Sequence, residues 1–137
     1  MFPTCLSTPR FRPGSIVLDL GCGAGIDSLI AANKTGPTGR VHGVDFSLSM
    51  LSHARAGDET AGIENVKFRE AEGQRFPFSD GTFDVVLVNG IFNLNRHDIF
   101  EELARVIRPG GVVYCGEIVL NEFMDDEERA GLSNWFS

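Results

Sequence analysis

Short apolar runs alternate along the chain with longer segments in which apolar residues recur every three or four positions. The short runs predict buried strands, and the periodic segments predict helices. The predicted strands are residues 15–20, 40–44, 66–69, 83–88 and 112–115, with an extension to 119 left open, and the predicted helices are residues 28–33, 47–61, 98–107 and 125–135. This alternation predicts an α/β fold in which helices cover both faces of a doubly wound, mainly parallel sheet, with ligands at the carboxyl ends of the strands.

The chain is long enough to bury one core and shows no sign of a second domain. It has 137 residues, of which 42% are hydrophobic, and no linker, repeat or low-complexity stretch divides it. We therefore expect a single domain over residues 1–137. No apolar run is long enough to span a bilayer and no signal peptide is recognisable, so we expect a cytoplasmic protein without a membrane partner.

Charge and cysteine content narrow the class of ligand. The formal net charge is −7, with 19 acidic against 12 basic residues, which argues against a nucleic-acid partner. The three cysteines, Cys5, Cys22 and Cys115, are odd in number and have no C-x-x-C spacing. Neither a disulfide framework nor a structural metal site is expected. The sequence thus favours a small-molecule ligand and no bound metal.

The candidate chemistry begins where the first predicted strand ends in a glycine-rich loop. Gly21, Gly23 and Gly25 follow Asp19 at alternate positions. A dinucleotide-binding loop has its third glycine one residue later and faces a pyrophosphate, which Asp19 would repel. The spacing therefore favours a ligand that carries an amine near the loop. A glycine turn without a ligand and a degenerate NAD site are the alternatives.

A second carboxylate, Asp45, ends the second predicted strand about twenty residues after the glycine loop. This interval suits a group that accepts hydrogen bonds from both hydroxyls of a ribose. The alternative is that Asp45 caps the following helix or is an ordinary turn residue. Phe46 and Met50 follow it closely and could pack on the face of an adenine, or could belong to the core.

The glycine loop has the form D-x-G-x-G-x-G, and here the chain resembles class I S-adenosylmethionine-dependent methyltransferases, which have a Rossmann-like fold with strand order 3-2-1-4-5 in a three-layer sandwich. The resemblance covers roughly residues 14–120. It implies that the cofactor is S-adenosylmethionine and that the loop wraps its methionine part. The loop residues that this assigns to the cofactor are Asp19, Gly21, Cys22, Gly23 and Gly25.

Two further stretches carry the resemblance. Residues 68–78 are similar to the family segment that follows the third strand, which implies that Glu72 binds the adenine amino group and that the amide of Gly73 donates to a ring nitrogen. A solvated glutamate is the alternative reading of Glu72. The family residues just past the fourth strand lie beside the methyl donor. Asn89 and Gly90 are therefore expected to line the floor of the site, with the Asn89 amide offered to cofactor or substrate.

Within the family, three segments resemble the arsenite methyltransferase branch. They are Asn89-x-x-x-Asn93-Leu94 and the residues 36–39 and 116–119. That branch holds trivalent arsenic on thiolates, one of which directly follows the asparagine matched by Asn89. Here Gly90 stands at that position, and the two other branch cysteines would fall outside the chain. Cys22 and Cys115 are expected to be small packed residues, and Cys5 remains open as a ligand.

Gly90, Asn93 and His97 are the candidates on the substrate side, although a surface position at a helix start is the more common role for a residue such as His97. No catalytic residue is assigned, because methyl transfer needs alignment and not necessarily a base. We predict an S-adenosylmethionine-dependent methyltransferase acting on a small molecule. It is arsenite methyltransferase-like, with a quinone or other small-molecule C- or O-methyltransferase as the competing class. A non-catalytic cofactor- or partner-binding module is the alternative from another class.

The resemblance also bears on completeness and assembly. The predicted strands form the five-strand unit of a longer family pattern, so the chain is expected to be truncated relative to the family. A sheet with an uncovered edge can pair with a second copy. We therefore count a homodimer among the expected assemblies.

Overall fold

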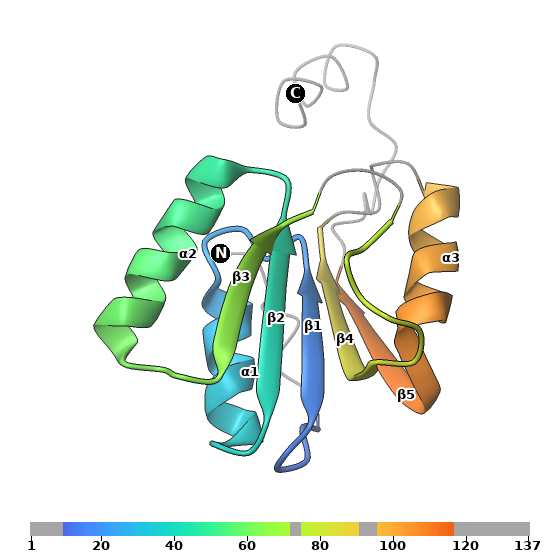
Figure 1. The fold of residues 1–137 in the computed structure, drawn as a ribbon, viewed down its shortest axis with the longest axis horizontal. Helices are drawn as coiled ribbons and strands as arrows, with labels where there is room; N and C mark the ends of the chain where they lie inside the picture. Colours follow the sequence, from blue (N-terminus) through green and yellow to red (C-terminus); the bar gives the residue numbers. More distant parts are fainter. Residues whose placement is uncertain (1–9, 72–74, 91–95, 117–137) are drawn as a thin grey trace, which may run out of the picture.

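The computed structural model describes residues 10–71, 75–90 and 96–116 as a parallel five-stranded sheet with helices on both faces (Figure 1). The order of strands across the sheet is β3-β2-β1-β4-β5, which confirms the predicted fold. The strands are β1 (Ile16–Leu20), β2 (Arg40–Asp45), β3 (Val66–Glu70), β4 (Phe83–Asn89) and β5 (Ile107–Gly116). The helices are α1 (Ile26–Thr35), α2 (Leu48–Ala61) and α3 (Arg96–Val106).

The strand register brings the carboxyl ends of the three central strands to one edge of the sheet. Leu20 of β1 pairs with Val44 of β2 on one side and with Val88 of β4 on the other. Since β1 lies between β2 and β4, the chain crosses in opposite directions on its two sides. The loop that leaves β1 therefore lies at a topological switch point, where open α/β sheets bind ligands.

Each face of the sheet buries its own apolar cluster, because successive side chains on a strand point to opposite faces. Val17, Val41 and Leu87 pack with residues of α1 and α2 on one face. On the other face, Leu18 and Val86 belong to the cluster that includes residues of α3. The predicted three-layer arrangement is confirmed, and among the described helices none is long and apolar enough to cross a bilayer.

The boundaries near α3 and β5 differ from those predicted. The helix was expected to continue to residue 107 and the strand to begin at 112, but β5 already begins at Ile107, which pairs with Phe83. The reason lies in the preceding loop. The amides of Gly81 and Thr82 donate to the carbonyls of Arg105 and Val106, at 2.8 and 2.7 Å, and so satisfy the end of the helix. The predicted helix 125–135 lies outside the described residues.

A network around Arg105 holds the segment that precedes β4 against α3. Its guanidinium donates to the carbonyls of Phe76 and Phe78 and forms ion pairs with Glu102 and Asp80. Glu102 in turn accepts the amide of Phe76 at 2.7 Å. The hydrogen bond from Arg105 lowers the pKa of Glu102, so this carboxylate stays ionised. The network thereby sets the course of the chain from β3 to β4.

We predict that Arg105→Ala lowers the melting temperature by several degrees, because it leaves Glu102 and two carbonyls without their donor. Arg12→Ala is the matched control, since Arg12 is exposed ahead of β1. Differential scanning calorimetry of both variants measures the effect. Equal melting temperatures for the two variants would show that the network does not stabilise the fold.

Candidate functional site

The loop after β1 is held in place by the end of β2. The amides of Gly21 and Cys22 both donate to the carbonyl of Val44, at 2.9 and 3.0 Å. The backbone has positive φ at Gly21, Gly23 and Gly25, with values of 72°, 52° and 84°. Such a succession of left-handed residues is accessible to glycine at little cost, which explains their alternate spacing in the sequence.

The glycines of this loop serve two different purposes. A Cβ atom on Gly25 would lie 2.8 Å from the ring of Phe68 and 2.9 Å from Ala54, so Gly25 lets the loop pack against β3 and α2. A Cβ atom on Gly23 would meet nothing within 4 Å. The Gly25 position is thus required by packing, whereas the Gly23 backbone faces open space that a ligand could occupy.

Asp45 joins the glycine loop to the start of α2. One carboxylate oxygen, Oδ2, accepts the amide of Gly23, and the other, Oδ1, accepts the amide of Ser47, each at 2.8 Å. The side chain that caps α2 is that of Ser47, whose Oγ accepts the amide of Met50 at 3.3 Å. A carboxylate has about four lone-pair positions, so Asp45 keeps acceptor capacity for a further donor pair. This arrangement suits the two hydroxyls of a ribose.

Asp19 lies beneath the loop and not on its surface. Its side chain is buried, with 1% of the residue exposed, and its Oδ2 accepts the hydroxyl of Ser28 at 2.6 Å. Burial raises the pKa of Asp19 to about 7, with the hydrogen bond from Ser28 opposing the shift and the charges of Asp27 and Asp45 adding to it. Asp19 can therefore act on a ligand through its charge and through the loop that it supports.

A polar pair bridges the start of α1 and the end of β4, and of its two members the sequence singled out Asn89 but not Asp27. Asn89, the last residue of β4, donates its side-chain amide to Oδ2 of Asp27 at 3.2 Å. The second oxygen of Asp27 is buried and has no hydrogen-bond partner in the described part of the chain. The available signal was a pair of polar residues, Asp27 and Ser28, directly after the glycine loop at the start of a helix. The structure thus places the carboxylate of Asp27 beside Asn89 at the switch point.

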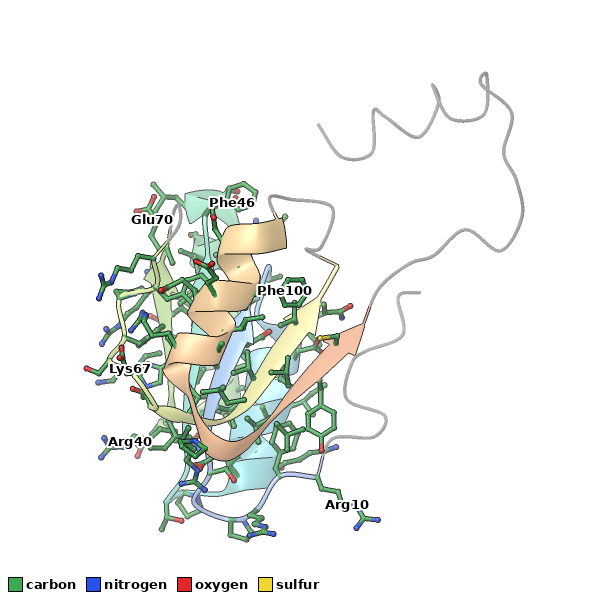
Figure 2. All side chains as sticks on the ribbon, turned by 90° about the vertical axis from the view of Figure 1, so that its right-hand side faces the viewer. Arg10, Arg40, Phe46, Lys67, Glu70 and Phe100 are labelled. Atoms are coloured by element: carbon green, nitrogen blue, oxygen red, sulfur yellow. The ribbon has the colours of Figure 1, made fainter. Side chains whose placement is uncertain are left out.

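Apolar side chains surround the same edge of the sheet. Phe46 is 65% exposed and Met50 is 45% exposed, so the described structure does not support a core role for either residue. Ile26 and Leu48 are also exposed. Figure 2 shows Phe46 at the end of the molecule where β2 finishes. These side chains leave an uncovered apolar surface beside Asp45, which suits the face of a purine.

The two cysteines within the described residues differ in their surroundings. Cys22 is buried, as expected, and burial raises the pKa of its thiol, so the thiol stays protonated at neutral pH. The expectation that Cys115 is packed was wrong. Cys115 is exposed because β5 is an edge strand and no described element covers it.

Several predicted site residues cannot be placed. Glu72, Gly73 and Asn93 lie outside the described residues, as does the side chain of His97. Gly90 is described: its amide donates to the carbonyl of Gly116 at 2.9 Å, and a Cβ atom there would meet nothing within 4 Å. Among the described residues, no group of three or more histidine, cysteine or acidic side chains could hold a metal ion.

The sheet order, with a glycine loop at its switch point and a carboxylate at the end of β2, defines the Rossmann-like core of class I methyltransferases. The chain matches a family described as a methyltransferase domain over residues 11–136, and it belongs to that family. The cofactor of this class is S-adenosylmethionine. The open backbone at Gly23, the remaining acceptor capacity of Asp45 and the exposed Phe46 fit that molecule.

The relatives of the chain include an arsenite methyltransferase and a demethylmenaquinone methyltransferase. It is 42% identical over 117 residues to an arsenite methyltransferase of Halobacterium salinarum, covering 83% of this chain and 30% of the relative. It is 37% identical over 108 residues to a demethylmenaquinone methyltransferase of Bacillus cytotoxicus, covering 77% and 46%. A solved arsenic(III) S-adenosylmethionine methyltransferase from Chlamydomonas reinhardtii superposes with a TM-score of 0.76 at 26% identity, covering 93% of this chain and 46% of that one. The chain thus spans less than half the length of these relatives.

Asp19 predicts a pH dependence of folding. Because its pKa of about 7 lies above the ordinary 3.8, the folded state keeps this proton between about pH 4 and 7 while the unfolded chain loses it. The stabilisation is complete below pH 4 and is lost as the pH rises to 7. We expect Asp19→Asn to remove this slope, so that its stability relative to the parent chain rises with pH by up to ~4 kcal/mol.

Urea unfolding at several pH values between 4 and 8 measures the difference. Ser28→Ala supplies a second arm. It removes the hydrogen bond that lowers the Asp19 pKa, so the slope should extend to higher pH. Parallel stability profiles for Asp19→Asn and the parent chain would contradict the assignment of the raised pKa to Asp19.

Proposed function

We propose that this chain binds S-adenosylmethionine at the carboxyl edge of the sheet and transfers its methyl group to a small molecule. The observation that carries the proposal is the junction at Asp45. Its carboxylate is fixed by the amides of Gly23 and Ser47 and retains acceptor capacity beside an open glycine backbone. The match to methyltransferases over nearly the whole chain supports the same reading.

Each part of the proposed cofactor site follows from a described contact or from the family resemblance. Asp45 would accept the ribose hydroxyls, and Phe46 and Met50 would cover the purine face. The loop from Gly21 to Gly25 would enclose the methionine part, over the charge of buried Asp19. Glu72 and Gly73, which are outside the described residues, are proposed on the resemblance alone as partners of the adenine edge.

S-adenosylmethionine supplies an electrophilic methyl group when it is bound. The residues of the chain then have to orient the acceptor and exclude competing water. Asn89 is suited to orientation, because its amide is already fixed on Asp27 at the end of β4. Gly90 leaves room for the acceptor next to it. Asn93 and His97 are proposed to approach from the segment that follows, His97 as a surface residue or as a partner of the substrate.

The cysteines of the chain limit which substrates it could accept. Relatives that methylate arsenite and demethylmenaquinone both match this chain. Trivalent arsenic prefers thiolate ligands. Cys22 is an unsuitable ligand because its buried thiol stays protonated. An arsenic substrate would therefore need Cys5, exposed Cys115 or cysteines outside this chain, whereas a quinol needs none of these. Arsenite methylation is our first proposal, on the strength of the 42% identical relative, and a quinone-type acceptor is the second.

Two further proposals concern the state of the domain. A non-catalytic module that binds the cofactor or a partner is the alternative to an enzyme, and Gly90 in place of a substrate cysteine is the feature that favours it. A homodimer formed through the edge of the sheet would cover the exposed Val112 and Val113 of β5.

The cofactor proposal predicts that Asp45→Ala weakens binding of S-adenosylhomocysteine about thirtyfold, on the order of 2 kcal/mol, because two hydrogen bonds to the ribose are lost. Isothermal titration calorimetry measures this. Ser47→Ala is the matched control, since it removes the α2 cap but leaves the Asp45 carboxylate in place. Loss of ~1 kcal/mol of stability with unchanged affinity is expected for the control. Equal affinities for Asp45→Ala and the parent chain would refute the ribose contact.

The enzyme proposal predicts that incubation with S-adenosylmethionine and an acceptor releases S-adenosylhomocysteine. Arsenite with a thiol, a demethylated quinol and a simple thiol form the panel, and mass spectrometry identifies the methylated product. Methylation of arsenite or of the quinol would decide the substrate class. Cofactor binding without turnover of any acceptor would instead support the non-catalytic module.

A further inference from the structure

Four basic side chains lie on one face of two neighbouring strands, in a row that begins at the end of the sheet opposite to the proposed cofactor site. Arg40 and His42 alternate along β2, and Lys67 and Arg69 alternate along β3. The register pairs His42 with Lys67 and Val44 with Arg69. Because residues two apart on a strand share a face, and paired residues on parallel strands do so as well, the four groups lie on one face in a staggered row, with His42 beside Lys67 in the middle and Arg40 and Arg69 at the two ends. We call Arg40, His42, Lys67 and Arg69 the basic array.

The array lies on the face of the sheet that carries α3, yet it is not covered by that helix. On this face, His42 is the neighbour of Leu18, which belongs to the cluster packed by α3. Figure 1 shows α3 beside β4 and β5, so on this face of the sheet no described helix covers β2 and β3. Helix α2 packs on the opposite face. Figure 2 shows Arg40 and Lys67 along the same side of the molecule.

The positive charges of the array are not compensated by ion pairs. In the described part of the chain, the salt bridges join Arg105 to Asp80 and Glu102, and Arg108 to Asp84. Neither Arg40, Lys67 nor Arg69 takes part in any of them. The chain carries 19 acidic against 12 basic residues, so acidic partners are abundant elsewhere in the sequence. Arg40, Lys67 and Arg69 are exposed, so their charges are open to an anion from solution.

A hollow lies against the array and gives an anion a place to bind. Arg40, His42 and Lys67 line it together with Asn65 and Glu64. These residues belong to the amino-terminal ends of β2 and β3, whereas Asp45 ends β2 on the far side. Along β2, three residue steps from His42 to Asp45 separate the hollow from the proposed cofactor site by about 10 Å of strand.

His42 is the member of the array whose pKa would change when an anion binds. Its ring is clasped edge-on by Phe78 and Phe83, at centroid distances of 5.3 and 5.8 Å, and its buried Nδ1 has no hydrogen-bond partner within the described structure. Burial lowers the pKa of His42, and the charges of Arg69, Lys67 and Arg40 lower it further. An anion beside these cations would offset their charges and would therefore raise the pKa of His42.

The other groups around His42 do not change the effect of the three cations on its pKa. Adjacent β1 presents Ile16 and Leu18 on the same face, and neither titrates. The guanidinium of Arg69 lies 5.9 Å from the centre of the Phe78 ring. Glu64, which is exposed at the rim of the hollow, is the one acidic side chain among the residues that line it.

We propose that Arg40, His42 and Lys67, with Arg69 alongside, form a second binding site that takes a small phosphate-bearing ligand. A phosphate group carries up to two negative charges and presents three acceptor oxygens. Arginine binds such a group through its forked N–H donors and lysine through a point charge. The proposal is independent of the methyltransferase site, because none of the four residues belongs to the glycine loop or to the proposed contacts with the cofactor.

Titration of the histidine C2–H signals by NMR tests the proposal. Inorganic phosphate is added to the full chain against sodium chloride at equal ionic strength, and His53 and His97 serve as internal references. The His42 signal is assigned from its loss in His42→Gln. We expect phosphate to raise the pKa of His42 in a saturable manner and to leave the two references unchanged. Pyrophosphate and glycerol phosphate then show whether a diphosphate or an ester binds more tightly.

Variants with matched controls sharpen the test. Lys67→Met and Arg40→Met should each weaken phosphate binding about tenfold, because each removes one charged contact. Glu64→Gln should strengthen binding, because it removes the opposing charge from the rim. Lys67→Gln replaces Lys67→Met if that variant melts early. All of them should bind S-adenosylhomocysteine like the parent chain, so a failure of the cofactor proposal would be seen separately.

Three outcomes would overturn the proposal. Equal effects of phosphate and chloride on His42 would mean that salt only screens the four charges. A linear, non-saturating shift would mean that the anion does not occupy a site. Unchanged phosphate affinity in both Lys67→Met and Arg40→Met would show that the array does not hold it.

Discussion

The end of β2 holds the glycine loop, and the arrangement of the site depends on this attachment. A loop with left-handed backbone at Gly21, Gly23 and Gly25 has no regular hydrogen-bonding pattern of its own. The carbonyl of Val44 accepts two of its amides, and the Asp45 carboxylate accepts a third. The strand next to β1 thereby fixes both the loop and the carboxylate that we propose to bind the ribose. Pairing of β1 with β2 is thus a condition for the site as well as for the core.

Burial of a carboxylate under this loop is the second constraint. Asp19, Asp27 and Asp45 lie close enough for their charges to interact, and burial together with these charges raises the pKa of Asp19. Like charges in a partly buried site favour the binding of a cation or of a proton. A positively charged ligand above the loop would stabilise the ionised carboxylate of Asp19 in place of that proton. The electrostatics agree with the preference for an amine-bearing ligand that the sequence suggested.

Periodicity and spacing predicted the strands and the position of Asp45, because these features depend on local patterns, whereas the order of the strands was implied by the family resemblance. The end of α3 was predicted too late, since the amides of Gly81 and Thr82 that complete the helix come from a distant loop. Cys115 was expected to be packed because strand residues usually are, and its exposure follows from its place on an edge strand. The contact between Asn89 and Asp27 joins residues 62 positions apart, so no local pattern could reveal it.

The basic array is a second feature that local sequence patterns alone could not predict. The period of a strand places Arg40 with His42, and Lys67 with Arg69, but only the register joins the two pairs into one row by setting His42 beside Lys67. A shift of β3 by one residue would turn Lys67 and Arg69 to the face that Phe68 now occupies. Phe68 prevents this shift, because its ring fills the space left by Gly25 and Gly43, where a Cβ atom would lie 2.8 and 2.6 Å away. The two glycines that let β3 pack against its neighbours therefore also hold the four basic groups together.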